Sequence, residues 1–408
     1  MKNLYVLLVA LLLVNGTMAQ WITQNCGTYT DLLSIYFIDN DTEYAVGGGG
    51  IMLKTTNGGN LWTPQTFGTY NYLNSVYFPV ADTGYAVGYN GTILKTTNGG
   101  ALWTSQNSGT SNILTSVYFT TANTGYVVDC LGEIHKTTNG GMLWTSQNTG
   151  AYNYLSAVYF TDTSTGYAVG GSDSASYSKG VILKTIDGGT LWTNQNSGTS
   201  IWLLSVYFPD ANTGYAVGQW GLILKTTNGG ALWTNQTSGT SNDLNSVYFI
   251  NVDTGYATGS ANTIGDNAPI LKTTNGGVLW KSQNSGTSEW LHSVYFTNVD
   301  TGYIVGTMGK MLKTTNGGGY PVGVNEQRAG STLLKIFPNP SDNEFTIETS
   351  EPSSQWQISI FDQNGQELIR QKFTKSTTTI NVSALASGVY VVKLVGERGV
   401  QVGKVVKQ

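Results

Sequence analysis

The sequence predicts an all-β chain, a seven-bladed β-propeller closed by an N-terminal strand and followed by a small β-sandwich domain. Two observations support this prediction. A segment of the form Leu-Lys-Thr-Thr-Asn-Gly-Gly occurs seven times with small variations, first at Leu53–Gly59 and last at Leu312–Gly318. Six copies continue into Leu-Trp, but the seventh stops, and a matching Trp segment stands near the start of the chain, at Trp21–Asn25.

Each repeat contains four short runs of β-branched and aromatic residues. In one repeat they are Ser75–Phe78, Gly84–Gly88, Ile93–Thr97 and Trp103–Gln106, each bounded by Gly, Asn or Asp. Runs this short do not make a helix, and four short antiparallel strands per unit are typical of a propeller blade. Most neighbouring repeats place their Trp residues 41 residues apart, which fits this architecture.

The offset of the Trp segment predicts how the ring closes. The last repeat supplies three strands of its own, so its fourth edge is open. A strand at Trp21–Asn25 can pair there, which joins the start of the propeller to its end and removes an unpaired edge. We therefore expect seven blades over residues 20–318.

The composition limits the classes of partner. The net charge is -4, and the three arginines, Arg328, Arg370 and Arg398, all follow the last repeat. The propeller therefore has no basic surface of the kind that binds nucleic acid, and no nucleic-acid partner is expected. The two cysteines, Cys26 and Cys130, fall on opposite sides of the predicted ring, so we expect them to be unpaired.

The first 19 residues have the features of a secretory signal peptide. A lysine near the start is followed by an apolar run over Leu4–Val14 and by a small-residue cleavage site between Ala19 and Gln20. The apolar run is too short to span a bilayer, so we expect no membrane span in the mature chain. The predicted boundaries are a signal peptide at 1–19, the propeller at 20–318, a linker at 319–332 and a C-terminal domain at 333–408.

The turn between the third and fourth strands has a clear structural logic. Its Asn or Asp can hydrogen-bond the turn backbone, its glycines allow positive φ, and its Trp can be buried. Because all the blades share these residues, we expect packing and turn geometry from them. The residues are Asn57, Trp62, Asn98, Trp103, Asn139, Trp144, Asp187, Trp192, Asn228, Trp233, Asn275 and Trp280. The repeated lysines, such as Lys54 and Lys225, are expected to cover apolar surface with solvated amino groups.

This turn resembles the Asp-box (bacterial neuraminidase, BNR) repeat, most closely at Thr185–Trp192. Together with the Thr-Gly-Tyr-Ala-Val-Gly and Lys-Thr-Thr-x-Gly-Gly segments, residues 21–318 are similar to the seven-bladed Ycf48-like family of photosystem assembly factors. The resemblance implies the fold. It does not imply the chemistry, because sialidases of this fold bind a carboxylate through an arginine cluster, and Ycf48-like factors carry an arginine-rich patch. This propeller contains no arginine.

Function is expected where the repeats differ. One variable position, in the loop before each first strand, holds aromatic residues in several repeats, and these loops should surround one mouth of the channel. Aromatic rings at a wet surface suit sugar stacking or a protein contact, although each ring could also pack on its own blade. The predicted ligand-binding residues are Tyr72, Tyr154, Trp202 and Trp290, with Trp220 in a nearby turn.

Acidic residues support a second hypothesis. Asp31, Asp243 and Glu289 occupy loops of neighbouring blades at the same mouth, and a glycosidase needs two carboxylates roughly 5 to 10 Å apart. A solvated acidic rim is the alternative reading of these three residues. The two histidines, His135 and His292, lie on different blades, so no metal site and no cofactor are predicted.

Residues 333–408 differ from the repeats, and their alternating strands suit a small Ig-like sandwich. The stretch contains Phe337-Pro338-Asn339-Pro340, an Asp-x-x-Gly turn at Asp362–Gly365, and Leu385–Tyr390. These motifs resemble the type A C-terminal sorting domain of the type IX secretion system. The resemblance implies recognition by that secretion machinery and release or anchoring at the outer surface of a Gram-negative bacterium, after passage through the periplasm.

The sequence thus predicts an exported, non-catalytic propeller that binds a glycan or a surface protein. The alternatives are a secreted glycan-degrading enzyme and a surface scaffold without a small ligand.

Overall fold

The computed structural model describes residues 21–66, 68–147, 149, 154–174, 177–263, 265–319, 335–348, 356–362, 366–373, 377–396 and 399–408. The chain divides into two compact units, the first ending at Gly319. The predicted signal peptide lies outside the described residues, as does all of the predicted linker except Gly319. The four predicted boundaries therefore stay predictions.

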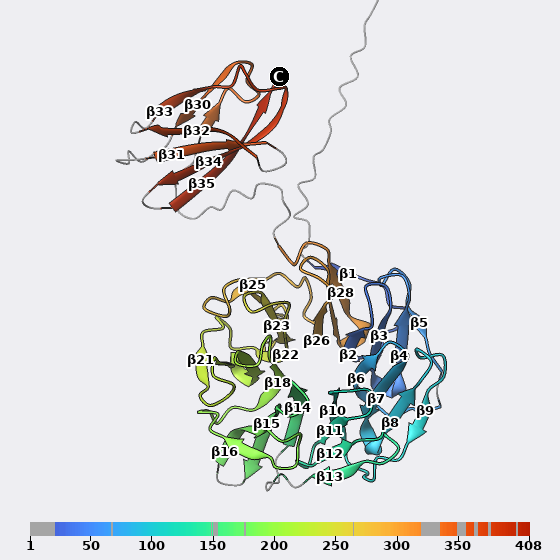
Figure 1. The fold of residues 1–408 in the computed structure, drawn as a ribbon. Helices are drawn as coiled ribbons and strands as arrows, with labels where there is room; N and C mark the ends of the chain where they lie inside the picture. The colour runs from blue at the N-terminus through green and yellow to red at the C-terminus, as the bar shows by residue number, and fades with distance from the viewer. Residues whose placement is uncertain are drawn as a thin grey trace, which may run out of the picture. The chain divides into compact units, whose positions relative to one another are not determined.

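Seven four-stranded antiparallel sheets form the first unit, and they follow one another around a common axis (Figure 1). Blades 1 to 3 consist of β2 (Leu32–Phe37), β3 (Glu43–Gly47), β4 (Met52–Thr55) and β5 (Thr63–Pro64); β6 (Leu73–Val80), β7 (Thr83–Gly88), β8 (Ile93–Thr96) and β9 (Thr104–Gln106); and β10 (Leu114–Phe119), β11 (Gly125–Asp129), β12 (Ile134–Thr137) and β13 (Thr145–Gln147).

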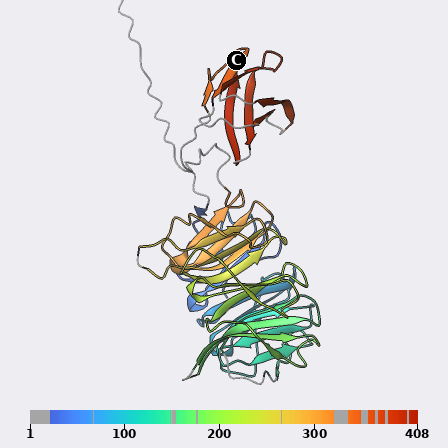
Figure 2. The ribbon, with the colours of Figure 1, turned by 90° about the vertical axis from the view of Figure 1, so that its left-hand side faces the viewer.

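Blades 4 to 6 repeat this order. They consist of β14 (Tyr154–Phe160), β15 (Gly166–Ser174), β16 (Tyr177–Thr185) and β17 (Thr193–Gln195); β18 (Leu203–Tyr207), β19 (Gly214–Gly218), β20 (Ile223–Thr226) and β21 (Thr234–Gln236); and β22 (Asp243–Phe249), β23 (Gly255–Ser260), β24 (Ile270–Thr273) and β25 (Lys281–Gln283). In the view turned by 90°, the strands of successive blades are stacked (Figure 2).

Blade 7 is completed by the start of the propeller. Its own strands are β26 (Leu291–Phe296), β27 (Gly302–Gly306) and β28 (Met311–Thr314), and its fourth strand is β1 (Ile22–Thr23). Ile22 pairs with Lys313 and Thr23 with Leu312 in antiparallel register. Trp21 is 2% exposed and its indole N–H donates to Gln283 Oε1 at 2.9 Å. The predicted fold class, including closure by the N-terminal strand, is confirmed.

The apolar core of the propeller lies between the blades, with one buried cluster at each of the seven junctions. At the junction of blades 1 and 2, for example, Tyr44 and Val46 pack against Phe78 and Trp103. Each blade therefore buries both faces against its neighbours, which explains why the strands read as nearly continuous apolar runs.

The innermost strands place a closed ring of tyrosines around the axis. Each ring contacts the next with centroids 4.9 to 5.5 Å apart, and the last contacts the first. Burial raises the pKa of every member, so the hydroxyls stay neutral. The members are Tyr36, Tyr77, Tyr118, Tyr159, Tyr207, Tyr248 and Tyr295.

The second unit contains two sheets. One consists of β29 (Lys335–Phe337), β30 (Glu344–Glu348) and β33 (Thr377–Asn381), and the other of β32 (Glu367–Phe373), β31 (Trp356–Phe361), β34 (Gly388–Gly396) and β35 (Gly399–Lys407). Phe345, Ile347 and Ile380 of the first sheet share a buried core with Ile358 and Val392 of the second. The predicted small β domain after the propeller is confirmed.

Candidate functional site

The two ends of the blades differ, and we name them by their turns. The Asp-box end carries the turns between the third and fourth strands. The turn end carries the turns between the second and third strands and the loops that lead into the first strands. All five predicted ligand-binding aromatics belong to the turn end.

Trp220 is held in an unusual backbone conformation at the turn end. Four blades have a 3-10 turn between their second and third strands: η1 (Gly48–Gly50), η2 (Tyr89–Gly91), η3 (Gln219–Gly221) and η4 (Thr307–Gly309). The middle residue of η3 is Trp220, with φ 56°, and its side chain is 64% exposed. A bulky residue in this left-handed region carries a conformational cost. The chain therefore holds a large aromatic ring at an exposed turn tip despite that cost.

The other predicted aromatics are less uniform. Trp290 is 53% exposed, whereas Tyr72 and Tyr154 are about half as accessible as a free side chain or less. The ring of Tyr72 is tilted against that of Tyr89, with centroids 5.2 Å apart, and the ring of Tyr154 against that of Trp202, at 5.4 Å. Each of these rings therefore has an aromatic neighbour at the turn end.

One predicted ligand-binding residue, Trp202, packs closely against a neighbouring blade. Trp202 lies against Gly171 of the preceding blade so closely that a Cβ atom there would be 2.4 Å from the indole ring. Tyr72 similarly lies against Gly48. Trp202 and Tyr72 thus pack in part against a blade, as the alternative interpretation expected. The side chains of Trp220 and Trp290 are more exposed to solvent.

A shallow groove of about 550 Å³ lies beside Trp220. Ile201, Leu222, the end of β21 and the polar loop at 237–241 line it together with Trp220. A groove lined by an exposed indole and by both polar and apolar residues suits an extended ligand. A second depression of about 410 Å³ lies at the Asp-box end, beside Tyr77 and Tyr118.

The three candidate catalytic carboxylates hold turns. Asp31 accepts a hydrogen bond from the backbone N–H of Met308 in blade 7, and Asp243 accepts one from the N–H of Trp220 in blade 5, both at 2.9 Å. Glu289 accepts from the Thr307 hydroxyl at 3.0 Å. The Asp residues thus stabilise the left-handed turn residues of the preceding blade, which gives them a structural use that the sequence had not indicated.

The Asp-box turns join neighbouring blades. In blade 2, Asn98 Oδ1 accepts the backbone N–H of Leu102 and the Thr96 hydroxyl, both at 2.9 Å, while Trp103 is 5% exposed. The carbonyl oxygen of Gly99 accepts from Tyr44 and Lys54 of blade 1.

The same lysine and tyrosine contact recurs at all seven junctions. Each lysine amino group lies 5.1 to 5.7 Å from the centroid of the tyrosine ring beside it. The expectation of solvated lysine heads is therefore wrong: Lys54 and Lys225 donate to the turn of the next blade. Lysine and tyrosine act together there because one carbonyl oxygen has two lone pairs.

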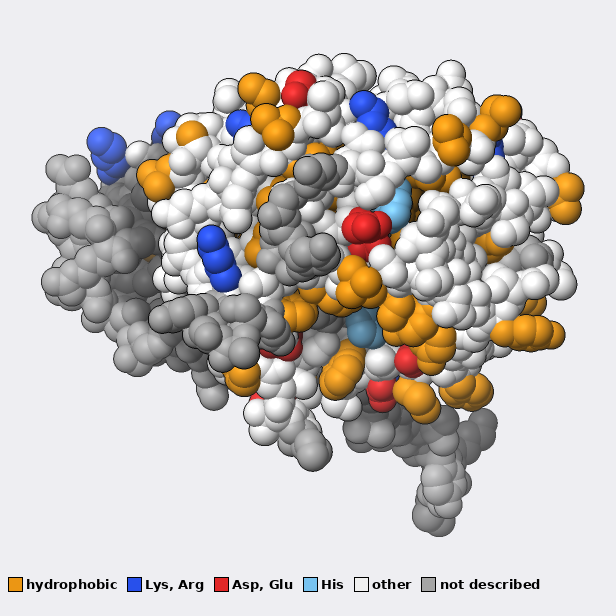
Figure 3. All heavy atoms as spheres, turned by 90° about the horizontal axis from the view of Figure 1, so that it is seen from below, with side chains coloured by type: hydrophobic (Ala, Val, Ile, Leu, Met, Phe, Trp, Pro, Cys, Tyr) orange, Lys and Arg blue, Asp and Glu red, His pale blue; other side chains and the backbone are white. Residues whose placement is uncertain are grey.

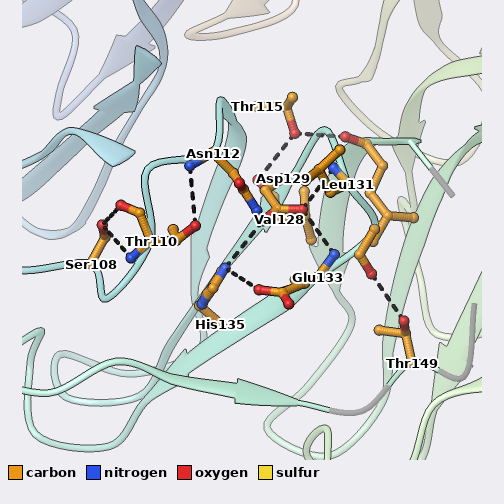
Figure 4. Close-up of polar contacts among 12 residues, drawn as sticks. Ser108, Thr110, Asn112, Thr115, Val128, Asp129, Leu131, Glu133, His135 and Thr149 are labelled. Carbon is orange, nitrogen blue, oxygen red and sulfur yellow. Dashed lines mark hydrogen bonds and ion pairs between the residues drawn. The ribbon is translucent and has the colours of Figure 1, made fainter. Parts of the chain in front are cut away.

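The structure brings together a cluster that sequence reasoning missed. In blade 3, His135 Nε2 lies 3.3 Å from Asp129 Oδ2 and 3.5 Å from Glu133 Oε2 (Figure 4). His135 and Asp129 are buried, and Glu133 is exposed. The prediction of no metal site compared His135 only with His292. The signal that could have found the cluster is that blade 3 alone replaces both a repeated Gly and a repeated Leu.

Hydrogen bonds stabilise the ionised form of Asp129. Burial alone would raise the pKa of Asp129, but His135, Asn112 and the backbone N–H groups of Glu133 and Leu131 lower it below its ordinary value. On the face seen in Figure 3, acidic and histidine side chains lie among exposed hydrophobic ones.

Comparisons with known proteins agree with this architecture. Residues 335–408 match the family model of the secretion system C-terminal sorting domain. Residues 14–108 and 192–283 match the model of the photosynthesis system II assembly factor YCF48. Both predicted resemblances are confirmed. The sorting-domain match indicates export by type IX secretion and attachment at the cell surface.

Solved structures show the same fold at low identity. A structure of YCF48 bound to D1 peptide is 20% identical with a TM-score of 0.61, covering 73% of this chain and 97% of that one. A GH74 enzyme of Niastella koreensis is 16% identical with a TM-score of 0.59, covering 95% of this chain and 74% of that one. A GH74 xyloglucanase of Xanthomonas campestris is 12% identical with a TM-score of 0.60, covering 94% and 75%. At these identities the likeness shows the fold alone.

No protein of curated function matches the chain in sequence. Over the residues that the structure describes, we find no helix that is both long and apolar enough to cross a bilayer.

Proposed function

We propose that the exported propeller is a non-catalytic binding module whose turn end contacts a glycan or a surface protein. The observation that carries this proposal is Trp220, an exposed indole at a left-handed turn tip that lines a groove. The three other blades with this 3-10 turn place Gly49, Asn90 or Met308 at the same left-handed tip, so only blade 5 uses the turn to expose an indole.

Stacking on aromatic rings indicates which classes of ligand the turn end could bind. Trp220 and Trp290 offer flat apolar faces beside hydroxyl and amide groups, the combination that binds sugars or an extended peptide edge. Two of the solved structures with this fold illustrate a peptide ligand and a sugar ligand, since one is a peptide complex and another is a xyloglucanase.

The experiment measures binding of the full exported chain to a panel of polysaccharides and cell-surface proteins. We expect W220A to lower the affinity for the bound partner at least about 10-fold, as for an aromatic hot spot. L143A is the matched control, because Leu143 is equally exposed but lies at the Asp-box end. Equal binding by W220A and the unchanged chain would contradict the proposal.

The same panel tests the enzyme alternative. Product release from a polysaccharide, lost in E289Q, would establish a glycosidase and overturn the non-catalytic proposal. We expect no such release, because Asp31 and Asp243 hold turn backbone in place and their displacement would disrupt the blades that they join.

The export route completes the proposed function. We propose that residues 1–19 direct the chain to the periplasm with cleavage between Ala19 and Gln20, and that residues 333–408 are then recognised by the type IX machinery. Residues 326–408 fused to a fluorescent reporter that carries its own signal peptide should reach the outside of a host with that system. A reporter retained in the periplasm would contradict the second step.

A further inference from the structure

The turn of blade 3 departs from the repeat at three positions at once. Asp129 stands where the six other blades have Gly, and His135 where they have Leu. Glu133 replaces Ile, Thr, Leu or Lys in the four blades with a turn of the same length. The first departure is the least expected on steric grounds, since a Cβ atom at Gly88, the matching position of blade 2, would lie 1.8 Å from a backbone oxygen.

The three side chains converge at metal-ligand spacing. His135 Nε2 is 3.3 Å from Asp129 Oδ2 and 3.5 Å from Glu133 Oε2, and all three ligand atoms lie within 4.8 Å of one another. An ion with tetrahedral ligands at about 2.0–2.2 Å separates neighbouring ligand atoms by about 3.3–3.6 Å. The distances from His135 Nε2 to Asp129 Oδ2 and to Glu133 Oε2 match that geometry. Both distances are long for hydrogen bonds to a charged group.

The charges of the cluster also favour a bound cation. The hydrogen bonds to Asp129 come from Asn112, His135 and the backbone N–H groups of Leu131 and Glu133, and none of these donors carries a fixed positive charge. A proton on His135 Nε2 can face one carboxylate well, but not two. A divalent cation between the three groups would balance both carboxylates.

The surroundings would also orient the ligands. Asn112 Nδ2 donates to Asp129 Oδ2 at 2.7 Å, and both backbone N–H groups hold Oδ1 at 2.9 Å (Figure 4). Such outer contacts fix a ligating carboxylate in one direction. His135 is set on β12 and Asp129 at the end of β11, two strands paired in register, so the backbone presents both ligands from one rigid sheet.

We propose that Asp129, Glu133 and His135 form a binding site for a divalent transition-metal ion of the zinc class. One imidazole and two carboxylates without a thiolate suit such an ion. Three protein ligands leave a fourth position for water or a ligand group, and the exposure of Glu133 places that position toward solvent. The site lies at the turn end, and it does not depend on the proposed binding function of Trp220.

The test titrates the full exported chain, freed of metal with a chelator, with ZnCl₂ by calorimetry and follows its melting temperature. We expect one ion per chain and a rise in melting temperature. H135L, which restores the Leu of the other blades, should weaken binding at least about 100-fold. The matched control is H292L, since blades 1 and 5 carry Leu33 and Leu204 at that position, and it should bind zinc as the unchanged chain does.

A second ligand variant keeps the test decisive if H135L folds poorly. E133T places the Thr of blade 2 at an exposed position and should also weaken binding while the metal-free chain melts as before. Absence of saturable zinc binding by the unchanged chain would overturn the proposal. Equal binding by E133T, H135L and H292L would overturn it as well, because the zinc would then be held elsewhere.

Discussion

The Asp-box end and the turn end of the same seven blades use their side chains in different ways. At the Asp-box end, seven lysines and seven tyrosines each donate to a glycine carbonyl of the next blade, and the pattern runs around the ring without a break. At the turn end, the copies differ and large aromatic side chains stay exposed. The comparison teaches that repetition in this chain maintains the ring, while variation supplies the surface for recognition.

Blade 7 differs most from the other blades, because its outer strand β1 comes from the start of the propeller. The ring of Trp21 meets Phe296 edge-on at 5.8 Å and Tyr256 at 6.4 Å. Deleting residues 20–26 from the mature chain should lower the free energy of unfolding by more than about 5 kcal/mol, because it removes a buried Trp and opens a sheet edge. Chemical denaturation measures this.

The control for that deletion lies in the same strand. Ile22 is 55% exposed, so I22T should change stability by less than about 0.5 kcal/mol. A deleted chain that unfolds at the same denaturant concentration as the intact one would show that the Asp-box contacts of Lys313 and Tyr303 to Gly58 close the ring alone.

Blade 1 carries a buried acid at its junction with blade 7. Glu43 occupies the position of a glycine in the other blades, and neither of its carboxylate oxygens has a hydrogen-bond partner. Burial raises its pKa from 4.5 to about 8, only partly opposed by Lys313 and by Tyr303, whose hydroxyl donates to Gly58 instead. The folded chain therefore holds this proton more tightly than the unfolded chain does.

Stability should consequently fall as the pH rises. The contribution of the neutral carboxyl is complete below pH 4.5 and is lost as the pH passes 8, which gives a loss of about 4 kcal/mol between pH 5 and pH 9. In E43Q this loss should be absent, and E43G should behave in the same way because it restores the repeat. Parallel denaturation curves for E43Q and the unchanged chain at both pH values would contradict the predicted pKa.

Much of the fold could be predicted, because the chain contains its own alignment. Seven copies separate shared from variable positions, and the displaced segment at Trp21–Asn25 reveals the closure. The contacts between blades were harder to predict. That Lys54 reaches Gly99 of the next blade depends on the angle between neighbouring sheets, and no local pattern reports that angle.

The candidate site was only partly predictable for the same reason. Aromatic residues at variable positions were visible, but the fit of Trp202 against Gly171 required coordinates. The carboxylates of Asp31 and Asp243 looked available until their backbone partners in other blades were known. Asp129 and His135 are six positions apart, and only the antiparallel pairing of β11 with β12 makes them neighbours.

The repeated lysine contact gives a smaller effect than the closure. Lys225 Nζ donates to Gly276 O at 2.6 Å and lies 5.5 Å from the Tyr215 ring centroid. K225M keeps the apolar stem but removes the donor and the charge, so it should cost about 1–2 kcal/mol. K281M changes an exposed lysine of β25 and should stay within about 0.5 kcal/mol. Equal stability of the two variants would restore the interpretation of solvated lysine heads.

The smallest expected effect concerns a junction where the repeat is incomplete. A bulge in the first strands frees a serine hydroxyl that accepts the backbone N–H of the next blade, as Ser75 does from Val117 at 3.3 Å. Six blades have this serine. Blade 4 has Ala157, which faces Val206 without a hydroxyl.

A157S should therefore raise the free energy of unfolding by about 0.5–1 kcal/mol, and S75A should lower it by a similar amount. The two changes are mirror images in the same structural position, so a difference in their size reports how well the backbone N–H of Val206 is hydrated in the unchanged chain. A157S that destabilises the propeller would mean that the junction between blades 4 and 5 has repacked around the alanine. In that case the copies would differ in their packing at this junction as well as in their surface.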